Sequence, residues 1–202
     1  MFVKICGLSN EMHVQVAVEA GADAVGFVFA ESVRRVEPLQ AARIASRVPE
    51  SVKRVAVMLH PSNDEWQEVL RDFGPDVLQT DAADFESLDV PESVECWPVY
   101  REGKKVTGTF RVSTEVPVTF LYEGARSGSG EKVDWSQAAT IAAQGNMILA
   151  GGISADNVAE AIATVHPYGV DVSSAVESAP GQKDSQLIRE FISAAKAAEN
   201  DL

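Results

Sequence analysis

The segment Met147–Ser174, MILAGGISADNVAEAIATVHPYGVDVSS, contains the repeating unit that decides the fold. It begins with a short apolar run, MILAG, continues through the helix-like pattern ADNVAEAIATV, and ends with a second apolar run, GVDVSS. Apolar residues on consecutive positions are typical of parallel strands covered on both faces, whereas a half-exposed antiparallel strand alternates apolar and polar residues. The segment is therefore predicted to form a strand, a helix and a second, parallel strand.

Apolar runs rich in β-forming residues recur along the whole chain, about eight times in total and at intervals of roughly 20 to 30 residues. The others are FVKI at Phe2, AVGFVF at Ala24, RVAVML at Arg54, DVLQ at Asp76, CWPVY at Cys96 and VTFLY at Val118. Helical patterns lie between most of them. Asn10, Ser62, Asp134 and Ser154 precede such patterns as candidate N-caps, and Pro38 lies at a first turn.

Alternating strands and helices leave two architectures, a closed (β/α) barrel and an open doubly wound sheet. The rough period and the number of units favour the closed (β/α)8 barrel, or TIM barrel. A chain of 202 residues with 46% hydrophobic residues is enough for one sizeable core, so we expect a single domain over residues 1–202. Arg101–Pro117 contains glycines and β-branched residues where the fifth helix is expected, and this helix is predicted to be reduced or missing.

Charge and cysteine content limit the partners and the compartment. A formal net charge of −13 argues against nucleic acid as the main partner, because phosphate backbones are bound by clustered Lys and Arg. No apolar run approaches the roughly 18 residues of a membrane span, and MFVKICGLS lacks the features of a secretory signal. Cys6 and Cys96 belong to no metal-binding motif, and the histidines have no ligand spacing. We expect a cytoplasmic protein with free thiols, no metal site and no membrane contact.

The candidate site residues follow from the fold, because the active site of a (β/α) barrel is built at the carboxyl ends of its strands. Residues of suitable chemistry at or just after predicted strand ends are Cys6, Arg34, Gln79, Asp81, Glu123, Gly151, Gly152, Asp171, Ser173 and Ser174. These residues are predicted to converge on one mouth of the barrel.

Two of these residues could transfer protons. Cys6 could act as a base or nucleophile, since a thiol with a pKa of about 8.5 needs only a modest shift to ionise near neutrality. The alternative is a small buried hydrophobic residue. Glu123 could act as an acid if partial burial raised its pKa, and the alternative is a solvated loop residue. Sequence position alone leaves both pairs of alternatives open.

Two turns and an arginine pair indicate an anionic ligand. LAGGIS, Leu149–Ser154, and VDVSSAVE, Val170–Glu177, place small residues after the last two strands, where backbone N–H groups can approach a phosphate. Ordinary turn and capping chemistry is the alternative for each turn, but together the two turns favour a phosphate. Arg34 and Arg35 follow the second strand, where either could hold a carboxylate or simply carry surface charge.

Taken in order, KICGLS, VGFVFAESVRRVEP, VLQTD, FLYEGARSGSGEKVDW, LAGGISADNV and VDVSSAVE resemble the successive motifs of the phosphoribosylanthranilate isomerases of tryptophan biosynthesis. The resemblance covers nearly the whole chain, and its most specific parts are KICGL and VDVSS followed by VE. It implies a TIM barrel that converts N-(5-phosphoribosyl)anthranilate to 1-(2-carboxyphenylamino)-1-deoxyribulose 5-phosphate by an Amadori rearrangement. The family needs no metal or cofactor, so the expected partner is a phosphorylated small molecule.

The resemblance also implies residue roles. Cys6 is expected to be the general base that takes a proton from C2′, and Arg34 is expected to hold the anthranilate carboxylate. Asp171 matches an aspartate near the sugar. The phosphate cradle is expected from Gly151, Gly152, Ser173 and Ser174.

Several positions depart from the family's motifs. Glu123 stands where the family has its aspartate general acid, and Asp81 replaces the histidine that follows Gln79 in the fourth strand. Val33 replaces a proline and Ala175 a glycine. Two other functions therefore stay open: a phosphoribosyl aldose-ketose isomerase serving both the histidine and tryptophan pathways, and a weakened barrel that acts as a binding protein. The sequence also leaves open whether the protein is a monomer or a homodimer.

Overall fold

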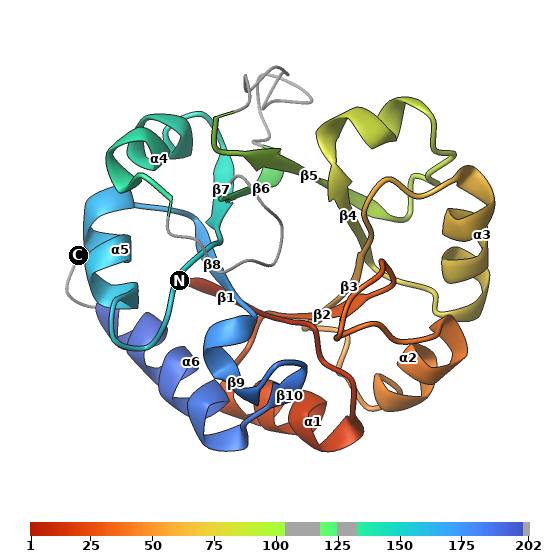
Figure 1. The fold of residues 1–202 in the computed structure, drawn as a ribbon, viewed down its shortest axis with the longest axis horizontal. Coiled ribbons are helices and arrows are strands. Elements are labelled where there is room, and N and C mark those ends of the chain that lie inside the picture. The colour runs from red at the N-terminus through yellow and green to blue at the C-terminus, as the bar shows by residue number, and fades with distance from the viewer. Residues whose placement is uncertain (104–117, 125–132, 200–202) are drawn as a thin grey trace.

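The computed structural model describes residues 1–103, 118–124 and 133–199. Eight parallel strands close into one barrel in the order β1-β2-β3-β4-β5-β6-β7-β8 (Figure 1). The strands are β1 Phe2–Cys6, β2 Ala24–Val28, β3 Lys53–Val57, β4 Val77–Asp81, β5 Glu95–Arg101, β6 Thr119–Glu123, β7 Asn146–Leu149 and β8 Gly169–Val172. The predicted TIM barrel is confirmed.

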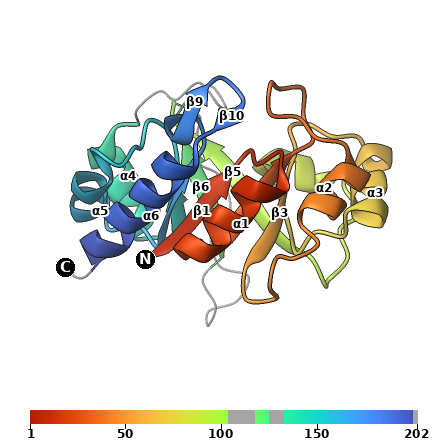
Figure 2. The ribbon, with the colours of Figure 1, turned by 90° about the horizontal axis from the view of Figure 1, so that it is seen from below.

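The helices lie around the outside of the barrel (Figures 1 and 2). They are α1 Glu11–Ala20, α2 Pro38–Ile44, α3 Asn63–Asp72, α4 Trp135–Ala142, α5 Val158–Val165 and α6 Ser185–Glu199. The predicted caps are found at Asn10, Ser62 and Asp134, each of which accepts a backbone N–H of its helix. Among the described residues, we find no helix with the length and apolar character required to cross a membrane.

One predicted cap is wrong. Helix α5 begins at Val158 with Asn157 as its N-cap residue, because the chain after Ser154 forms a tight turn closed by Ser154 and Asn157. The Asn157 side chain accepts from the Ser154 N–H at 2.8 Å and donates to the Gly152 carbonyl oxygen at 2.9 Å. This asparagine therefore fixes the glycine turn that follows β7.

The connection between β4 and β5 contains only a short 3-10 turn, η1 Ala82–Glu86, in place of an α-helix. The loop that follows packs on α3, where Trp66 Nε1 and Gln67 Nε2 both donate to the Asp89 carbonyl oxygen. The reduced helix predicted within Arg101–Pro117 falls mostly on residues 104–117, outside the described residues.

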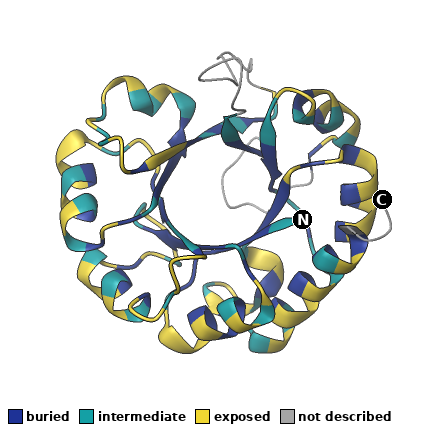
Figure 3. Ribbon diagram, turned by 180° about the vertical axis from the view of Figure 1, so that it is seen from behind, coloured by how far each residue is buried: buried dark blue, intermediate teal, exposed yellow. Residues whose placement is uncertain are grey.

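Both faces of the sheet are buried, which explains the continuous apolar runs of the sequence (Figure 3). Every residue of β2 is buried. Ala24 belongs to a core cluster inside the barrel together with residues such as Val55 and Leu121, whereas Val25 and Phe27 belong to the larger cluster that includes the surrounding helices. Parallel strands covered on both faces require this composition.

Parallel pairing brings all eight carboxyl ends to one mouth. Cys6, Asp81, Arg101 and Glu123 are the last residues of β1, β4, β5 and β6, and their strands hold them in register with their neighbours. After β8, a 3-10 turn, η2 Ser174–Val176, leads into a hairpin formed by β9 Glu177–Ala179 and β10 Gln182–Lys183. Figure 2 shows this hairpin at the end of the barrel away from the N-terminus.

Candidate active site

Cys6 lies buried at the mouth beside charged groups. Lys4 precedes it by two residues on the same strand face, and its Nζ donates to Asp171 Oδ1 at 2.9 Å. A Cβ added to Gly26, the β2 partner of Cys6, would lie 3.2 Å from both Cys6 Sγ and Lys4 Cε, so this glycine leaves room for the thiol and the lysine to meet. Burial raises the pKa of the Cys6 thiol, while the positive charges of Lys4 and Lys183 oppose the increase.

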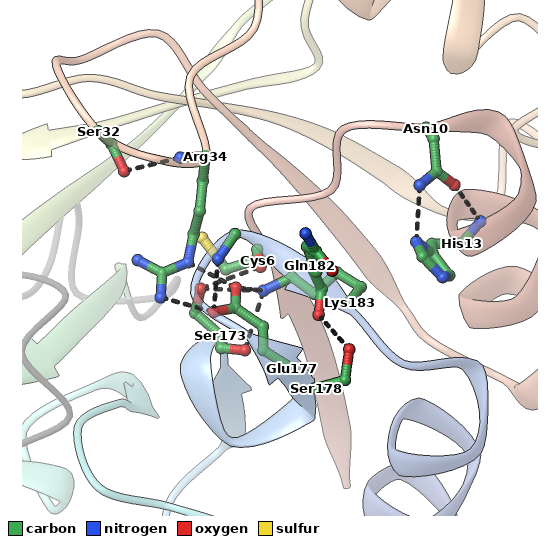
Figure 4. A network of polar contacts seen from close by, with 11 residues as sticks. Cys6, Asn10, His13, Ser32, Arg34, Ser173, Glu177, Ser178, Gln182 and Lys183 are labelled. Atoms are coloured by element: carbon green, nitrogen blue, oxygen red, sulfur yellow. Dashed lines mark hydrogen bonds and ion pairs between the residues drawn. The ribbon is translucent and has the colours of Figure 1, made fainter.

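Arg34 and Lys183 converge on the carboxylate of Glu177 (Figure 4). Arg34 donates from Nε at 2.6 Å and from Nη2 at 2.9 Å, and Lys183 Nζ donates at 2.7 Å. Burial opposes ionisation of Glu177, but the hydrogen bonds from Arg34 and Lys183 lower its pKa to about 2. Gly7 has a φ of +75°, and a Cβ there would lie 2.6 Å from Arg34 Cδ, so the glycine of KICGL makes room for this arginine.

The Glu177 network predicts a specific loss of acid stability. The pKa of Glu177 is about 2 in the folded protein, below its ordinary value of 4.5, so its ionised form stabilises the fold above pH 4.5. That contribution is lost as the pH falls from about 4.5 towards 2. We expect Glu177→Gln to flatten the fall in unfolding free energy across this window, measured by urea denaturation at a series of pH values. Glu190→Gln, an exposed control on α6, should leave the slope unchanged, and a wild-type slope in Glu177→Gln would contradict the prediction.

A second charged cluster joins β4, β5 and β6. The Arg101 guanidinium donates from Nη1 to Glu123 Oε1 and from Nη2 to Asp81 Oδ1. Its side chain is only 7% exposed. His60 lies nearby, with Nδ1 2.9 Å from Asp84 Oδ1 and Nε2 3.8 Å from Asp81 Oδ2. The glycine-rich stretch that follows Glu123 falls on residues 125–132, outside the described part of the chain.

The turns after β7 and β8 present small residues at the mouth. Gly151 and Gly152 have left-handed φ values of 88° and 63°, and their N–H groups donate to no other described residue. Ser173 Oγ donates to the Cys6 carbonyl oxygen at 3.2 Å, which ties the turn after β8 to the end of β1. Ser174 opens η2. Backbone of this kind can approach an anion closely.

Gln79 is buried in β4, yet its Oε1 accepts no hydrogen bond within the described residues. It lies on the same strand face as Val77, a member of the core cluster inside the barrel, and as Asp81. An unsatisfied buried amide oxygen costs about 1–3 kcal/mol. A polar ligand above the barrel would satisfy it.

A family model and curated relatives show the family of this chain. The family model for N-(5'phosphoribosyl)anthranilate (PRA) isomerase matches residues 3–194 of the chain. The chain belongs to this isomerase family. An N-(5'-phosphoribosyl)anthranilate isomerase of Streptococcus pneumoniae (strain Hungary19A-6) is 41% identical over 196 residues, covering 96% of this chain and 95% of the relative. One of Pelobacter propionicus is 39% identical over 210 residues, covering 98% and 97%.

Solved structures of the isomerase family share the fold. The crystal structure of phosphoribosyl anthranilate isomerase from Thermus thermophilus has a TM-score of 0.80 at 28% identity, covering 98% of this chain and 99% of that chain. A second isomerase structure has a TM-score of 0.78 at 29% identity, with the same coverage, and was solved in complex with reduced 1-(o-carboxyphenylamino)-1-deoxyribulose 5-phosphate.

Most of the predicted residues divide between two walls of one mouth, and Gly151 and Gly152 follow β7 between these walls. Cys6, Asp171 and Ser173 lie on the wall formed by β1 and β8. Asp81 and Glu123 lie on the wall formed by β4 to β6, and β5 is the strand farthest from β1 in the closed order. Arg34 follows β2 and reaches the first wall, where it contacts Glu177, a residue that follows β8.

Sequence reasoning missed four polar residues of the candidate site: Lys4, Arg101, Glu177 and Lys183. The position of Lys4 near Cys6 could have been predicted, because Lys4 precedes Cys6 by two residues in an apolar strand and must lie on the same face. Glu177 belonged to a motif of the resemblance but had no role attached to it. Arg101 follows an apolar run, and it was interpreted as the start of an irregular connection. Nothing in the sequence indicated that Lys183 folds back onto the mouth.

Proposed function

We propose that the chain catalyses the Amadori rearrangement of N-(5-phosphoribosyl)anthranilate to 1-(2-carboxyphenylamino)-1-deoxyribulose 5-phosphate in tryptophan biosynthesis. Membership of the isomerase family supports this reaction. The observation that carries the site assignment is the placement of a thiol, Cys6, and a carboxyl group, Glu123, at strand ends on opposite walls of one barrel mouth. An acid and a base on two sides of one sugar are what the rearrangement requires.

The proposed proton transfers balance within the site. Protonated Glu123 donates its proton to the furanose ring oxygen while the bond between that oxygen and C1′ breaks, which gives an open-chain iminium ion, the protonated imine of the anthranilate nitrogen. The Cys6 thiolate then takes the proton from C2′, and the resulting enolamine tautomerises to the ketone. Solvent exchange afterwards returns a proton to Glu123 and removes one from Cys6. No metal or cofactor takes part in these steps.

The remaining predicted residues would bind and orient the substrate. We assign the phosphate to the turns after β7 and β8, where Gly151 and Gly152 have N–H groups available and Ser173 and Ser174 complete the cradle. We assign the anthranilate carboxylate to Arg34, whose guanidinium is held in place by Glu177. Asp171, Gln79 and Asp81 are assigned to the sugar, as polar groups near the proposed base and acid. These are roles for a small phosphorylated substrate, and the two free thiols support the cytoplasm as the compartment.

Anthranilate fluorescence provides the test of the proposed function. Purified protein mixed with freshly prepared N-(5-phosphoribosyl)anthranilate should make the fluorescence decay, and the gene should complement a strain that lacks the isomerase. A flat signal with retained binding of a product analogue would instead indicate a binding protein. Turnover of the related histidine-pathway aminoaldose alongside this substrate would indicate an isomerase that serves both pathways.

The Lys4 contact predicts a shifted pH profile. Because burial raises the pKa of Cys6 above its ordinary value, kcat/KM should still be rising with pH in the alkaline range, where the thiolate forms. Lys4→Met removes the neighbouring positive charge and should move this rising limb to higher pH. The pH dependence of Cys6 alkylation by iodoacetamide, measured in a Cys96→Ser background, should shift in the same direction. Lys53→Met, at the far end of the barrel in β3, is the control. If the rising limb of kcat/KM stays at the same pH in Lys4→Met, the Lys4 contact does not influence the pKa of the proposed base.

A further inference from the structure

Arg101 is bracketed by two carboxylates at the mouth. It ends β5 and pairs in register with Glu123 of β6, while Asp81 ends β4 on the other side. Its two terminal nitrogens each reach one carboxylate, Nη1 to Glu123 and Nη2 to Asp81. The guanidinium is buried, so these contacts act with little screening by water.

This arrangement is the reverse of the one around Glu177. There, two cations, Arg34 and Lys183, surround one carboxylate and hold it ionised. Around Arg101, two carboxylates surround one cation. With both carboxylates ionised the group of three carries a net charge of −1, and one bound proton makes it neutral. A buried group with a net charge of −1 accepts a proton more readily than a single, neutral ion pair does.

We propose that Arg101 is the positioning residue for Glu123, and that Asp81 is the counter-ion that leaves Glu123 able to carry a proton. This inference rests on the proposed function, in which Glu123 is the general acid. The glutamate side chain has several rotamers, and its contact with a buried, planar guanidinium fixes where the carboxyl group lies. A misplacement of about 1 Å can cost on the order of 100-fold in rate, so this contact matters for catalysis.

The two partners of Arg101 should influence Glu123 in opposite ways. An acid must be protonated, so activity falls as the pH rises through the pKa of Glu123. Arg101→Met removes a positive charge and should move this falling limb to higher pH, whereas Asp81→Asn removes a negative charge and should move it to lower pH. The other titratable groups near the cluster in the described structure are His60 and Asp84, beside Asp81, and Glu102, which accepts the Asp134 N–H. These are unchanged in both variants.

The experiment is a double-mutant cycle of Arg101→Met and Glu123→Gln with a pH profile for each variant. The anthranilate fluorescence assay measures turnover. Arg101→Met should lower kcat at least about 10-fold with little change in KM, and Arg101→Lys, which keeps the charge but not the two-pronged geometry, should lower kcat without moving the limb. In a Glu123→Gln background, Arg101→Met should cause no further loss of kcat, because the group that Arg101 positions is already inactive. Arg71→Met and Asp72→Asn, which alter an exposed ion pair on α3, are matched controls for the loss of each charge.

The outcomes separate this inference from the proposed function. Equal losses from Arg101→Met in the wild-type and Glu123→Gln backgrounds would show a purely structural role and overturn the inference alone. Limbs that move in the same direction in Arg101→Met and Asp81→Asn would also overturn it. Near-normal turnover in Glu123→Gln would overturn the assignment of the acid, and the inference with it. Arg101→Lys keeps the test decisive if Arg101→Met fails to fold.

Discussion

Replacement of Cys6 by alanine is expected to lower kcat at least about 100-fold while leaving a folded protein that binds a product analogue. A positioned general base contributes typically 10²–10⁴-fold, and no other described residue is assigned to take the C2′ proton. Binding should survive, because the phosphate turns and Arg34 lie on other segments of the chain. The measurement is steady-state turnover by anthranilate fluorescence, together with titration of the reduced product analogue.

The second cysteine provides the control for this experiment. Cys96 is the second residue of β5 and lies at the end of the barrel away from the mouth, where it is exposed. Cys96→Ala should therefore turn over at the wild-type rate. If Cys6→Ala retains near-normal turnover, the thiol is a small buried residue and another group takes the proton. If Cys6→Ala loses analogue binding and fold together, its role is structural.

The barrel was predictable because its signals are local. Consecutive apolar residues in β2 predicted a strand buried on both faces, and the recurrence of such runs predicted a closed parallel barrel. The N-caps at Asn10, Ser62 and Asp134 were also visible in short stretches of sequence. The cap at Ser154 was wrong because Asn157, three residues later, has two hydrogen-bonding groups and closes the turn instead.

The polar network of the site was only partly predictable, because its contacts join distant segments. The pairing of Arg34 with Glu177 spans 143 positions, and it depends on a hairpin after β8. Pro180-Gly181 is a turn signal in that hairpin, but no local pattern indicated that the hairpin packs against Arg34. Arg101 contacts residues 20 and 22 positions away because β4, β5 and β6 are adjacent: Arg101 pairs with Glu123, and Asp81 pairs with Val99, two residues before Arg101 on β5. Register of this kind is set by the closed barrel as a whole, so strand ends could be predicted individually but their mutual contacts could not.

Glu123→Gln is expected to lower kcat at least about 100-fold without unfolding the protein. The amide has nearly the same shape as the carboxyl group and its oxygen can still accept from Arg101 Nη1, but it has no proton of suitable acidity for the furanose oxygen. Circular dichroism and thermal unfolding should match the wild type, and the fluorescence assay should report the loss in kcat with little change in analogue binding. The pH profile should lose its falling limb, since the group that titrates there is gone.

Glu123→Asp distinguishes the position of the acid from its chemistry. The shorter side chain keeps a carboxylic acid of similar pKa but withdraws it by one methylene from Arg101, which holds the longer glutamate in place. We therefore expect Glu123→Asp to be slower than the wild type and to keep its falling limb, unlike Glu123→Gln. A faster Glu123→Asp enzyme would show that the longer acid is poorly placed and that the contact with Arg101 holds it away from the sugar. The direction of this single change in rate thus decides whether Arg101 and Glu123 form a working acid or a displaced one.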